Sequence, residues 1–117
     1  EVVIWGTGSP RRELMHVDDF AAGVLFLLEN ENPPDWINLG TGIDHSIQEI
    51  ANLVKEVVGY EGRINNDTSK PDGMPLKRLD VSLAEKLGWK AKISLDEGLR
   101  ATYEDFCDSL ASNTARL

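Results

Sequence analysis

Two loops concentrate basic residues in a chain that is otherwise acidic. Trp5–Arg12 contains a tryptophan, two glycines, a proline and paired arginines, and Lys70–Arg78 has a similar composition. Together they hold five of the twelve lysines and arginines, although the formal net charge is −8. Glycine and proline predict shaped turns, and guanidinium groups suit phosphate or carboxylate. The pattern indicates an anionic small ligand, although a surface hairpin with solvated arginines would have the same composition.

Length and charge narrow the class of protein. A chain of 117 residues predicts a single domain. The net charge of −8 argues against binding to nucleic acid or to an anionic membrane surface. The longest apolar stretch, Phe20–Leu28, is too short to span a bilayer. Cys107 is the single cysteine, which excludes a disulfide framework within the chain and favours a reducing, cytoplasmic location.

Alternating apolar runs and turn residues predict an α/β domain of short strands and about four helices. The first helix is apolar on almost every side, which indicates that more than one surface covers it. The other three begin at the capping-box sequences of Ser46, Ser82 and Ser94. Extended segments are expected at Val2–Trp5, Glu13–Val17, Trp36–Leu39 and Arg63–Asn65. In the last helix we expect a buried stripe of Leu95, Leu99, Thr102, Phe106 and Leu110.

Other motifs give weaker signals. Gly40–Gly42 connects a predicted strand to a helix but lacks the third glycine of a dinucleotide fingerprint, so a plain turn is favoured. His16 lies near Asp18 and Asp19, but either aspartate can cap the first helix, and no metal site is predicted. Cys107 has no basic neighbour in the sequence and is expected to be a packed thiol.

Longer sequence segments carry a family resemblance. Arg12–Asp19 followed by an apolar helix, and Ile37–Gly42 followed by a capped helix, resemble the C-terminal part of extended short-chain dehydrogenase/reductases that act on nucleotide sugars. Further segments are similar to the NADPH-dependent epimerase/reductases of GDP-4-keto-6-deoxy-mannose within that family. These segments are Val3–Glu13, Val58–Arg63, Asp67–Gly73, Lys77–Asp80, Leu87–Trp89 and Ile93–Gly98.

The resemblance implies that Trp5, Arg12, Asp72 and Lys77 bind the GDP-sugar substrate. Their types fit this role, because Arg12 and Lys77 suit a diphosphate, Asp72 can accept from sugar or base donors, and Trp5 offers a flat apolar face. The sequence departs from the family pattern at three places. Met74 and Leu76 stand where threonine and arginine are usual, and Leu14 stands where phenylalanine is usual, which leaves the identity of the sugar open.

The resemblance also implies that the reaction depends on residues outside this chain. In the family, the glycine-rich cofactor loop and the Tyr-x-x-x-Lys pair precede this region, and neither Tyr60 nor Tyr103 has a lysine four residues later. Cys107 and His16 do not match the acid–base pair of the family. The chain begins at Glu1, within an apolar run and without an initiator methionine, which suggests a fragment, although a processed or trimmed polypeptide would look the same.

We therefore expect residues 1–117 to be one C-terminal substrate-binding domain without the Rossmann domain that binds NADPH. This domain would hold no catalytic, cofactor-binding or metal-binding residue, would be inactive alone, and would self-associate through surfaces that the cofactor domain covers. Two alternatives remain: the same portion of another nucleotide-sugar epimerase or dehydratase, and a binding module with no enzymatic partner.

Overall fold

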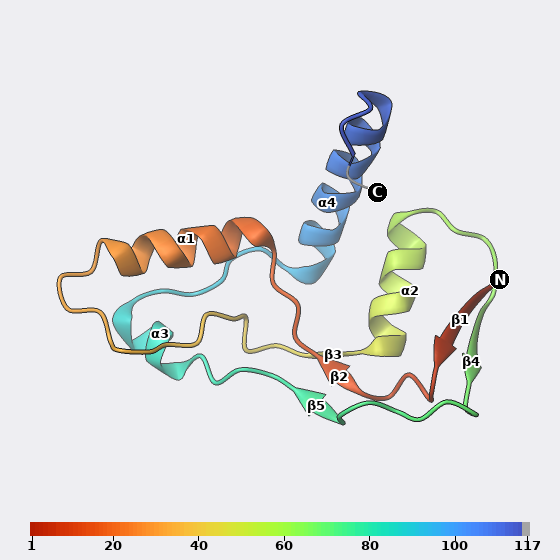
Figure 1. Cartoon of the computed structure of the whole chain (residues 1–117), viewed down its shortest axis with the longest axis horizontal. Helices are drawn as coiled ribbons and strands as arrows, with labels where there is room; N and C mark the ends of the chain where they lie inside the picture. The colour runs from red at the N-terminus through yellow and green to blue at the C-terminus, as the bar shows by residue number, and fades with distance from the viewer. Residues whose placement is uncertain (116–117) are drawn as a thin grey trace.

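The structure is a computed structural model that describes residues 1–115. This part of the chain contains two small sheets and four helices (Figure 1). The molecule is flat, with extents of 51 × 39 × 20 Å. This is the α/β architecture of short strands and four helices that the sequence predicts. Among the described residues, no helix combines the length and the apolar character that a membrane crossing needs.

The first sheet is a parallel pair at the end of the molecule where the chain begins. β1 (Val2–Trp5) pairs with β4 (Ile64–Asp67), so that Trp5 lies opposite Asp67. The prediction of β1 is confirmed, and β4 begins one residue later than expected. Gly6 ends β1 with a φ of +79°, a conformation that residues with a Cβ rarely adopt.

The second sheet brings three distant segments together. β2 (Arg11–Arg12) lies in the middle, antiparallel to β3 (His45–Ser46) and parallel to β5 (Leu76–Lys77). The expected strand at 13–17 is therefore wrong, because the strand lies on the two arginines instead. Because β3 and β5 are each only two residues long, they offer no hydrogen-bond partners to the residues after Glu13. The first helix then begins at Val17.

Two of the three predicted capping boxes are confirmed. Ser46 caps α2 (Ile47–Val57), and Ser94 caps α4 (Leu95–Ala111), each with the reciprocal glutamate bond. The third is wrong, because Ser82 is the first residue of α3 (Ser82–Leu87) rather than its cap. The backbone N–H of Ser82 instead donates to the carboxylate of Asp80 at 3.0 Å.

The start of α1 (Val17–Leu28) also differs from the prediction. His16 is the capping residue, and its Nδ1 accepts a hydrogen bond from the N–H of Asp18 at 3.3 Å. Asp19 is 6% exposed and accepts from the N–H groups of Lys92 and Ile93 at 2.9 and 2.8 Å. Asp19 therefore ties α1 to the segment before α4, and neither aspartate caps the helix.

The predicted strand at Trp36–Leu39 is absent from the described structure. No other described segment pairs with these residues, and a β-strand is stable only when its N–H and C=O groups find partners. The side chain of Trp36 is 77% exposed. The segment thus carries strand-forming residues without a sheet to join.

The apolar core of the described chain is small. Its buried apolar side chains are Ile4, Ala84 and Trp89, and α1 approaches Trp89 closely at Gly23, where a Cβ would lie 2.9 Å from the ring. The accessible surface is 8460 Å², whereas a compact protein of this mass exposes about 6,300 Å². The radius of gyration is 17.0 Å, against about 13.4 Å for a compact domain of this length.

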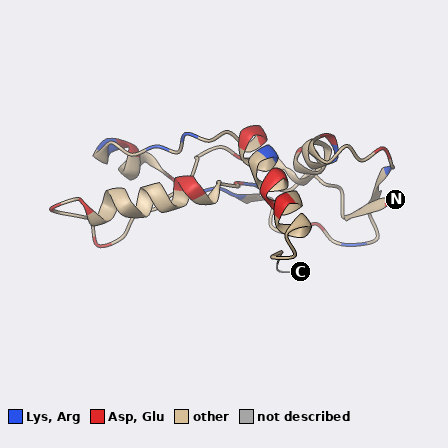
Figure 2. Ribbon diagram, turned by 90° about the horizontal axis from the view of Figure 1, so that it is seen from above, with Lys and Arg blue, Asp and Glu red and all other residues tan. Residues whose placement is uncertain are grey.

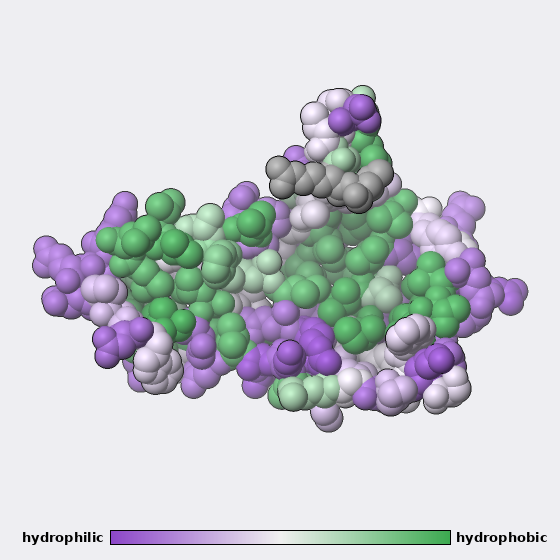
Figure 3. Space-filling view, viewed as in Figure 1, coloured by the Kyte–Doolittle hydropathy of each residue, from purple (hydrophilic) through white to green (hydrophobic). Residues whose placement is uncertain are grey.

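The excess surface includes large apolar side chains on α1. Phe20, Leu25 and Leu28 are 50%, 59% and 76% exposed. No charged residue interrupts the helix after its first turn (Figure 2). Figure 3 shows apolar surface over α1 and a second apolar area between α2 and α4. The sequence predicts more than one covering surface for α1, and within the described residues these side chains are largely exposed, so the covering surface stays a prediction.

Beyond its first turns, α4 has little of the predicted buried stripe. The chain is buried at Gly98, but Phe106 and Leu110 are 42% and 44% exposed, because this end of α4 projects away from the other elements (Figure 1). Cys107 lies on the same exposed part of the helix. The predictions of a buried stripe through Leu110 and of a packed thiol are therefore wrong.

Candidate functional site

The two basic loops identified in the sequence meet at β2 and β5. In the parallel register of these strands, Arg12 lies opposite Lys77. The N–H of Arg11 donates to the carbonyl of Pro75 at 2.8 Å, and that of Glu13 donates to the carbonyl of Lys77 at 3.1 Å. Segments far apart in the sequence thus form one loop cluster with two cationic residues side by side.

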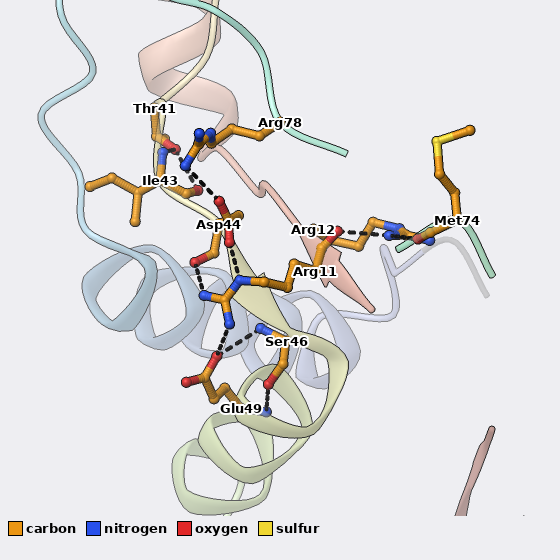
Figure 4. Close-up of polar contacts among 9 residues, drawn as sticks. All are labelled: Arg11, Arg12, Thr41, Ile43, Asp44, Ser46, Glu49, Met74 and Arg78. Carbon is orange, nitrogen blue, oxygen red and sulfur yellow. Dashed lines mark hydrogen bonds and ion pairs between the residues drawn. The ribbon is translucent and has the colours of Figure 1, made fainter. Parts of the chain in front are cut away.

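The Arg12 side chain lies against the turn before β5. Its Nη1 donates to the carbonyls of Met74 and of Arg11, both at 2.7 Å (Figure 4). A Cβ on Gly73 would lie 3.1 Å from Nη2 of Arg12, so only glycine lets the guanidinium lie this close without displacement. Among the described residues, carbonyl contacts occupy Nη1 alone, which leaves the other guanidinium N–H groups available for an anion.

A second bridge joins the loops at Asp72. Its carboxylate accepts from the backbone N–H and the hydroxyl of Thr7, each at 2.8 Å. Trp5, two residues before Thr7, is 73% exposed, and the ammonium of Lys70 lies 5.7 Å from its ring centroid. Trp5 and Asp72 therefore belong to the same loop cluster as Arg12 and Lys77.

A cavity of about 480 Å³ opens beside β5. Of the four residues predicted to bind substrate, Lys77 lines it, whereas Trp5, Arg12 and Asp72 do not. The structure thus gathers all four in one loop cluster without placing them around one cavity. The lining residues are Glu13, Met15, Leu39, Gly40, Leu76, Lys77, Arg78 and Leu79.

Arg11 belongs to a different set of contacts. It forms an ion pair with Asp44 and approaches Glu49 at 3.6 Å, while Arg78 contacts the other oxygen of Asp44 at 3.0 Å (Figure 4). The Asp44 side chain is only 7% exposed. The hydrogen bond from Arg11 lowers the pKa of Asp44 below its usual value and raises that of Arg11. Arg11 and Arg78 are thus already paired with a carboxylate.

Glu13 connects three segments. One oxygen of its carboxylate accepts from the N–H groups of Thr41 and of Gly42 (the latter at 3.0 Å), and the other accepts from the N–H of Leu79 at 2.7 Å. Sequence reasoning identified neither Glu13 nor Asp44 as important. Their partners lie 28 or more residues away along the chain, so no local spacing indicates these contacts.

The contacts of Glu13 also bear on cofactor binding. A dinucleotide pyrophosphate binds to the free N–H groups of a glycine-rich turn. At Gly40–Gly42 a carboxylate already accepts the N–H groups of Thr41 and Gly42, and its negative charge opposes a phosphate. This turn does not fit a pyrophosphate, in agreement with the plain turn favoured by the sequence.

The residues considered for a metal site have structural partners instead. His16 caps α1, and Asp19 accepts two backbone N–H groups. Within residues 1–115, no three histidine, cysteine or acidic side chains gather in a way that could hold a metal ion.

Comparison with known proteins relates this fold to a family. Residues 1–40 match the model of the NAD dependent epimerase/dehydratase family. GDP-L-fucose synthase 1 of Arabidopsis thaliana is 51% identical over 89% of the chain and 32% of its own length. GDP-L-fucose synthase of Escherichia coli K12 is 47% identical over 93% of the chain and 37% of its own length.

A solved structure agrees with these relatives. The GDP-mannoheptose C4 reductase MlghC of Campylobacter jejuni, with NADP bound, is 42% identical, with a TM-score of 0.78 over 87% of the chain and 33% of the reductase. The fold is therefore that of a portion of an extended short-chain dehydrogenase/reductase. More particularly, the chain is a homologue of the GDP-L-fucose synthases in the NAD-dependent epimerase/dehydratase family. It spans about a third of the length of these relatives.

Proposed function

We propose that this chain is the GDP-sugar-binding portion of an NADPH-dependent GDP-L-fucose synthase, which converts GDP-4-keto-6-deoxy-D-mannose to GDP-L-fucose. Trp5, Arg12, Asp72 and Lys77 bind the substrate. The observation that carries the proposal is the pairing of β2 with β5, which sets Arg12 opposite Lys77. Cationic residues that lie opposite each other on paired strands suit the two negative phosphates of a nucleoside diphosphate.

The remaining site residues complete this assignment. The exposed ring of Trp5 provides a flat surface on which a base or a sugar can stack. Asp72 already accepts two hydrogen bonds from Thr7. A carboxylate has about four acceptor positions, so Asp72 retains capacity for a donor of the ligand. Its first role is to hold the two loops together, and substrate contact is its second.

NADPH supplies the hydride in the proposed reaction, and its binding site lies on another part of the enzyme. The Gly40–Gly42 turn supports this division, because Glu13 already uses its N–H groups. The residues that transfer protons also lie outside this chain, since no tyrosine here is followed by a lysine four residues later. The chain by itself therefore binds substrate without reaction.

The cofactor-binding part of the enzyme also covers the apolar face of α1. Leu25 and Leu28 on this helix are largely exposed, and such side chains in water favour association. Isolated copies of the chain therefore self-associate through α1. The single cysteine, which is exposed and free, suits the reducing cytoplasm, where we place the enzyme.

A second candidate substrate is the GDP derivative of another sugar. The similarity to a GDP-mannoheptose C4 reductase supports this alternative. Leu76 lines the cavity beside Lys77, and Met74 is 60% exposed at the neighbouring turn. These apolar side chains stand where the family resemblance leads us to expect polar ones, so the sugar preference is the least constrained part of the assignment.

Competition binding tests the nucleotide part of the proposal. GDP, UDP and dTDP should each be titrated into the chain. Each nucleotide should then be tested as a competitor of GDP-sugar for the intact enzyme that contains this chain. We expect GDP to bind at least about tenfold more tightly than the other two, since one buried base contact contributes about 1.4 kcal/mol or more. Equal affinities, or tighter binding of UDP, would assign the chain to a different nucleotide-sugar enzyme.

A further inference from the structure

The carboxylate of Glu13 lies where the two cation-bearing strands and the Gly40–Gly42 turn meet. Glu13 directly follows Arg12 in the chain, and its backbone N–H donates to the carbonyl of Lys77 at 3.1 Å. Its side chain accepts the N–H of Leu79, two residues after Lys77, at 2.7 Å. The backbone of Glu13 therefore bonds β5 at Lys77, and its side chain bonds the chain two residues further on, at Leu79.

The same carboxylate fixes the other wall of the cavity. One of its oxygens accepts from Thr41 and from Gly42, and it lies so close to Gly40 that a Cβ there would collide with it. Glu13, Gly40 and Lys77 all line the cavity of about 480 Å³. One acidic side chain thus joins the turn to the strand across this opening.

We propose that Glu13 is a positioning residue for the diphosphate site: it fixes Lys77 relative to Arg12 without itself contacting the ligand. The inference rests on the proposed function, because it concerns the same two cations. A carboxylate suits this role better than an amide does. Its two oxygens accept on both sides, whereas an amide presents one oxygen and an NH₂ group that cannot accept from an N–H.

Charge supports the distinction between positioning and direct binding. A carboxylate in contact with a diphosphate would repel it, and the Glu13 oxygens are already directed at three backbone N–H groups. Glu13 therefore acts on the phosphates through the placement of Arg12 and Lys77 rather than by contact. Substitution of Glu13 should therefore lower the affinity for ligands that carry phosphates and leave the affinity for ligands without phosphates unchanged.

The test compares GDP with guanosine, each titrated into the full chain and followed by amide NMR spectra. In Glu13→Gln, we expect the affinity for GDP to fall about tenfold, the size expected for a misplaced charge-assisted contact. The affinity for guanosine should change by less than about twofold, because it has no phosphates for the cations to meet. The amide signals of Thr41, Gly42 and Leu79 should shift in the same variant.

Glu97→Gln is the matched control, because Glu97 also accepts a backbone N–H, at 3.0 Å from Ser94, but lies at the start of α4. It should leave both affinities unchanged. Glu13→Asp retains the charge but is one methylene shorter and cannot reach both sides, so it should show a smaller loss for GDP. If Glu13→Gln does not fold, the same comparison of GDP affinity with guanosine affinity in Glu13→Asp tests the proposal.

Three results would overturn the inference. Unchanged GDP affinity in Glu13→Gln, together with a loss in Arg12→Ala, would remove the role of Glu13 and leave the proposed function intact. Equal losses for GDP and guanosine would show that Glu13 only maintains the fold. Absence of GDP binding by the unmodified chain would overturn the proposed function and the role of Glu13 with it.

Discussion

The guanidinium groups of Arg11 and Arg12 leave β2 on opposite sides, as neighbouring residues of a strand must. Arg11 contacts Asp44 next to α2, whereas Arg12 contacts the carbonyl of Met74 (Figure 4). Two identical side chains, adjacent in the sequence, therefore have different environments. One contributes to an ion-pair network, and the other is directed toward the proposed substrate loop.

This difference predicts different phenotypes for the two alanine variants of the intact enzyme. Arg12→Ala should weaken the binding of GDP-sugar by about 1.5–3 kcal/mol, the size of a hydrogen bond to a charged group, while NADPH affinity stays unchanged. Arg11→Ala should change substrate affinity much less and should instead lower stability. Calorimetric titration and thermal unfolding of both variants measure the two effects. Equal losses of substrate affinity would contradict the assignment of Arg12.

Acid should weaken the contacts of Asp44. Because its pKa in the folded chain is lowered from 3.8, mainly by the hydrogen bond from Arg11, the ionised form stabilises the fold at neutral pH. This contribution to the free energy of unfolding is lost as the pH falls from about 3.8 through the lower pKa that Asp44 has in the folded chain. Asp44→Asn should therefore be less stable than the parent at pH 7, and the difference should shrink toward pH 3.

Urea unfolding followed by tryptophan fluorescence at several pH values measures this difference. Glu31→Gln, in the exposed loop after α1, is the control and should change the free energy of unfolding by less than about 0.5 kcal/mol at each pH. A stability difference for Asp44→Asn that stays constant down to pH 2 would show that the carboxylate charge does not contribute.

The exposed face of α1 should drive self-association of the isolated chain. Leu25→Glu or Leu28→Glu should weaken this self-association by about 1.5–3 kcal/mol, because each replaces a large apolar group with a charge. Leu110→Glu, at a similarly apolar exposed position on α4, is the matched control. Sedimentation velocity over a range of concentrations measures the change. A monomeric parent at high concentration would contradict the prediction.

The purified chain should not oxidise NADPH in the presence of GDP-4-keto-6-deoxy-D-mannose. The N–H groups of Thr41 and Gly42 are bonded to Glu13, and neither Tyr60 nor Tyr103 is followed four residues later by the lysine that the family resemblance leads us to expect beside a catalytic tyrosine. NADPH absorbance should decay at the rate of a sample without protein. Turnover that persists through successive purification steps would place catalytic residues on this chain.

Local sequence signals predicted the elements that depend on local interactions. The boxes at Ser46 and Ser94 identified the starts of α2 and α4, because each cap and its glutamate lie three residues apart. The same pattern failed at Ser82, where Asp80 provides the acceptor. Trp36–Leu39 shows the other limit, since strand propensity gives no strand without a neighbour to pair with.

The site was predictable in its residue types but not in its geometry. Basic composition and family resemblance identified Arg12 and Lys77, and nothing in either loop indicated that two-residue strands would pair them. Asp44 and Glu13 were missed because their partners come from distant segments. Such contacts depend on the assembled topology, which a single sequence does not encode in any short window.

The parallel pairing of β2 with β5 also determines the order in which the site can form during synthesis. Arg12 leaves the ribosome long before Lys77, and the two are separated by some 65 residues. Closing such a loop has a large entropic cost, so contacts of this range form slowly and late in folding. A nascent chain that ends before β5 has Arg12 but no opposing cation. Ligand binding should therefore appear only after Lys77 has left the ribosome and β5 has paired with β2.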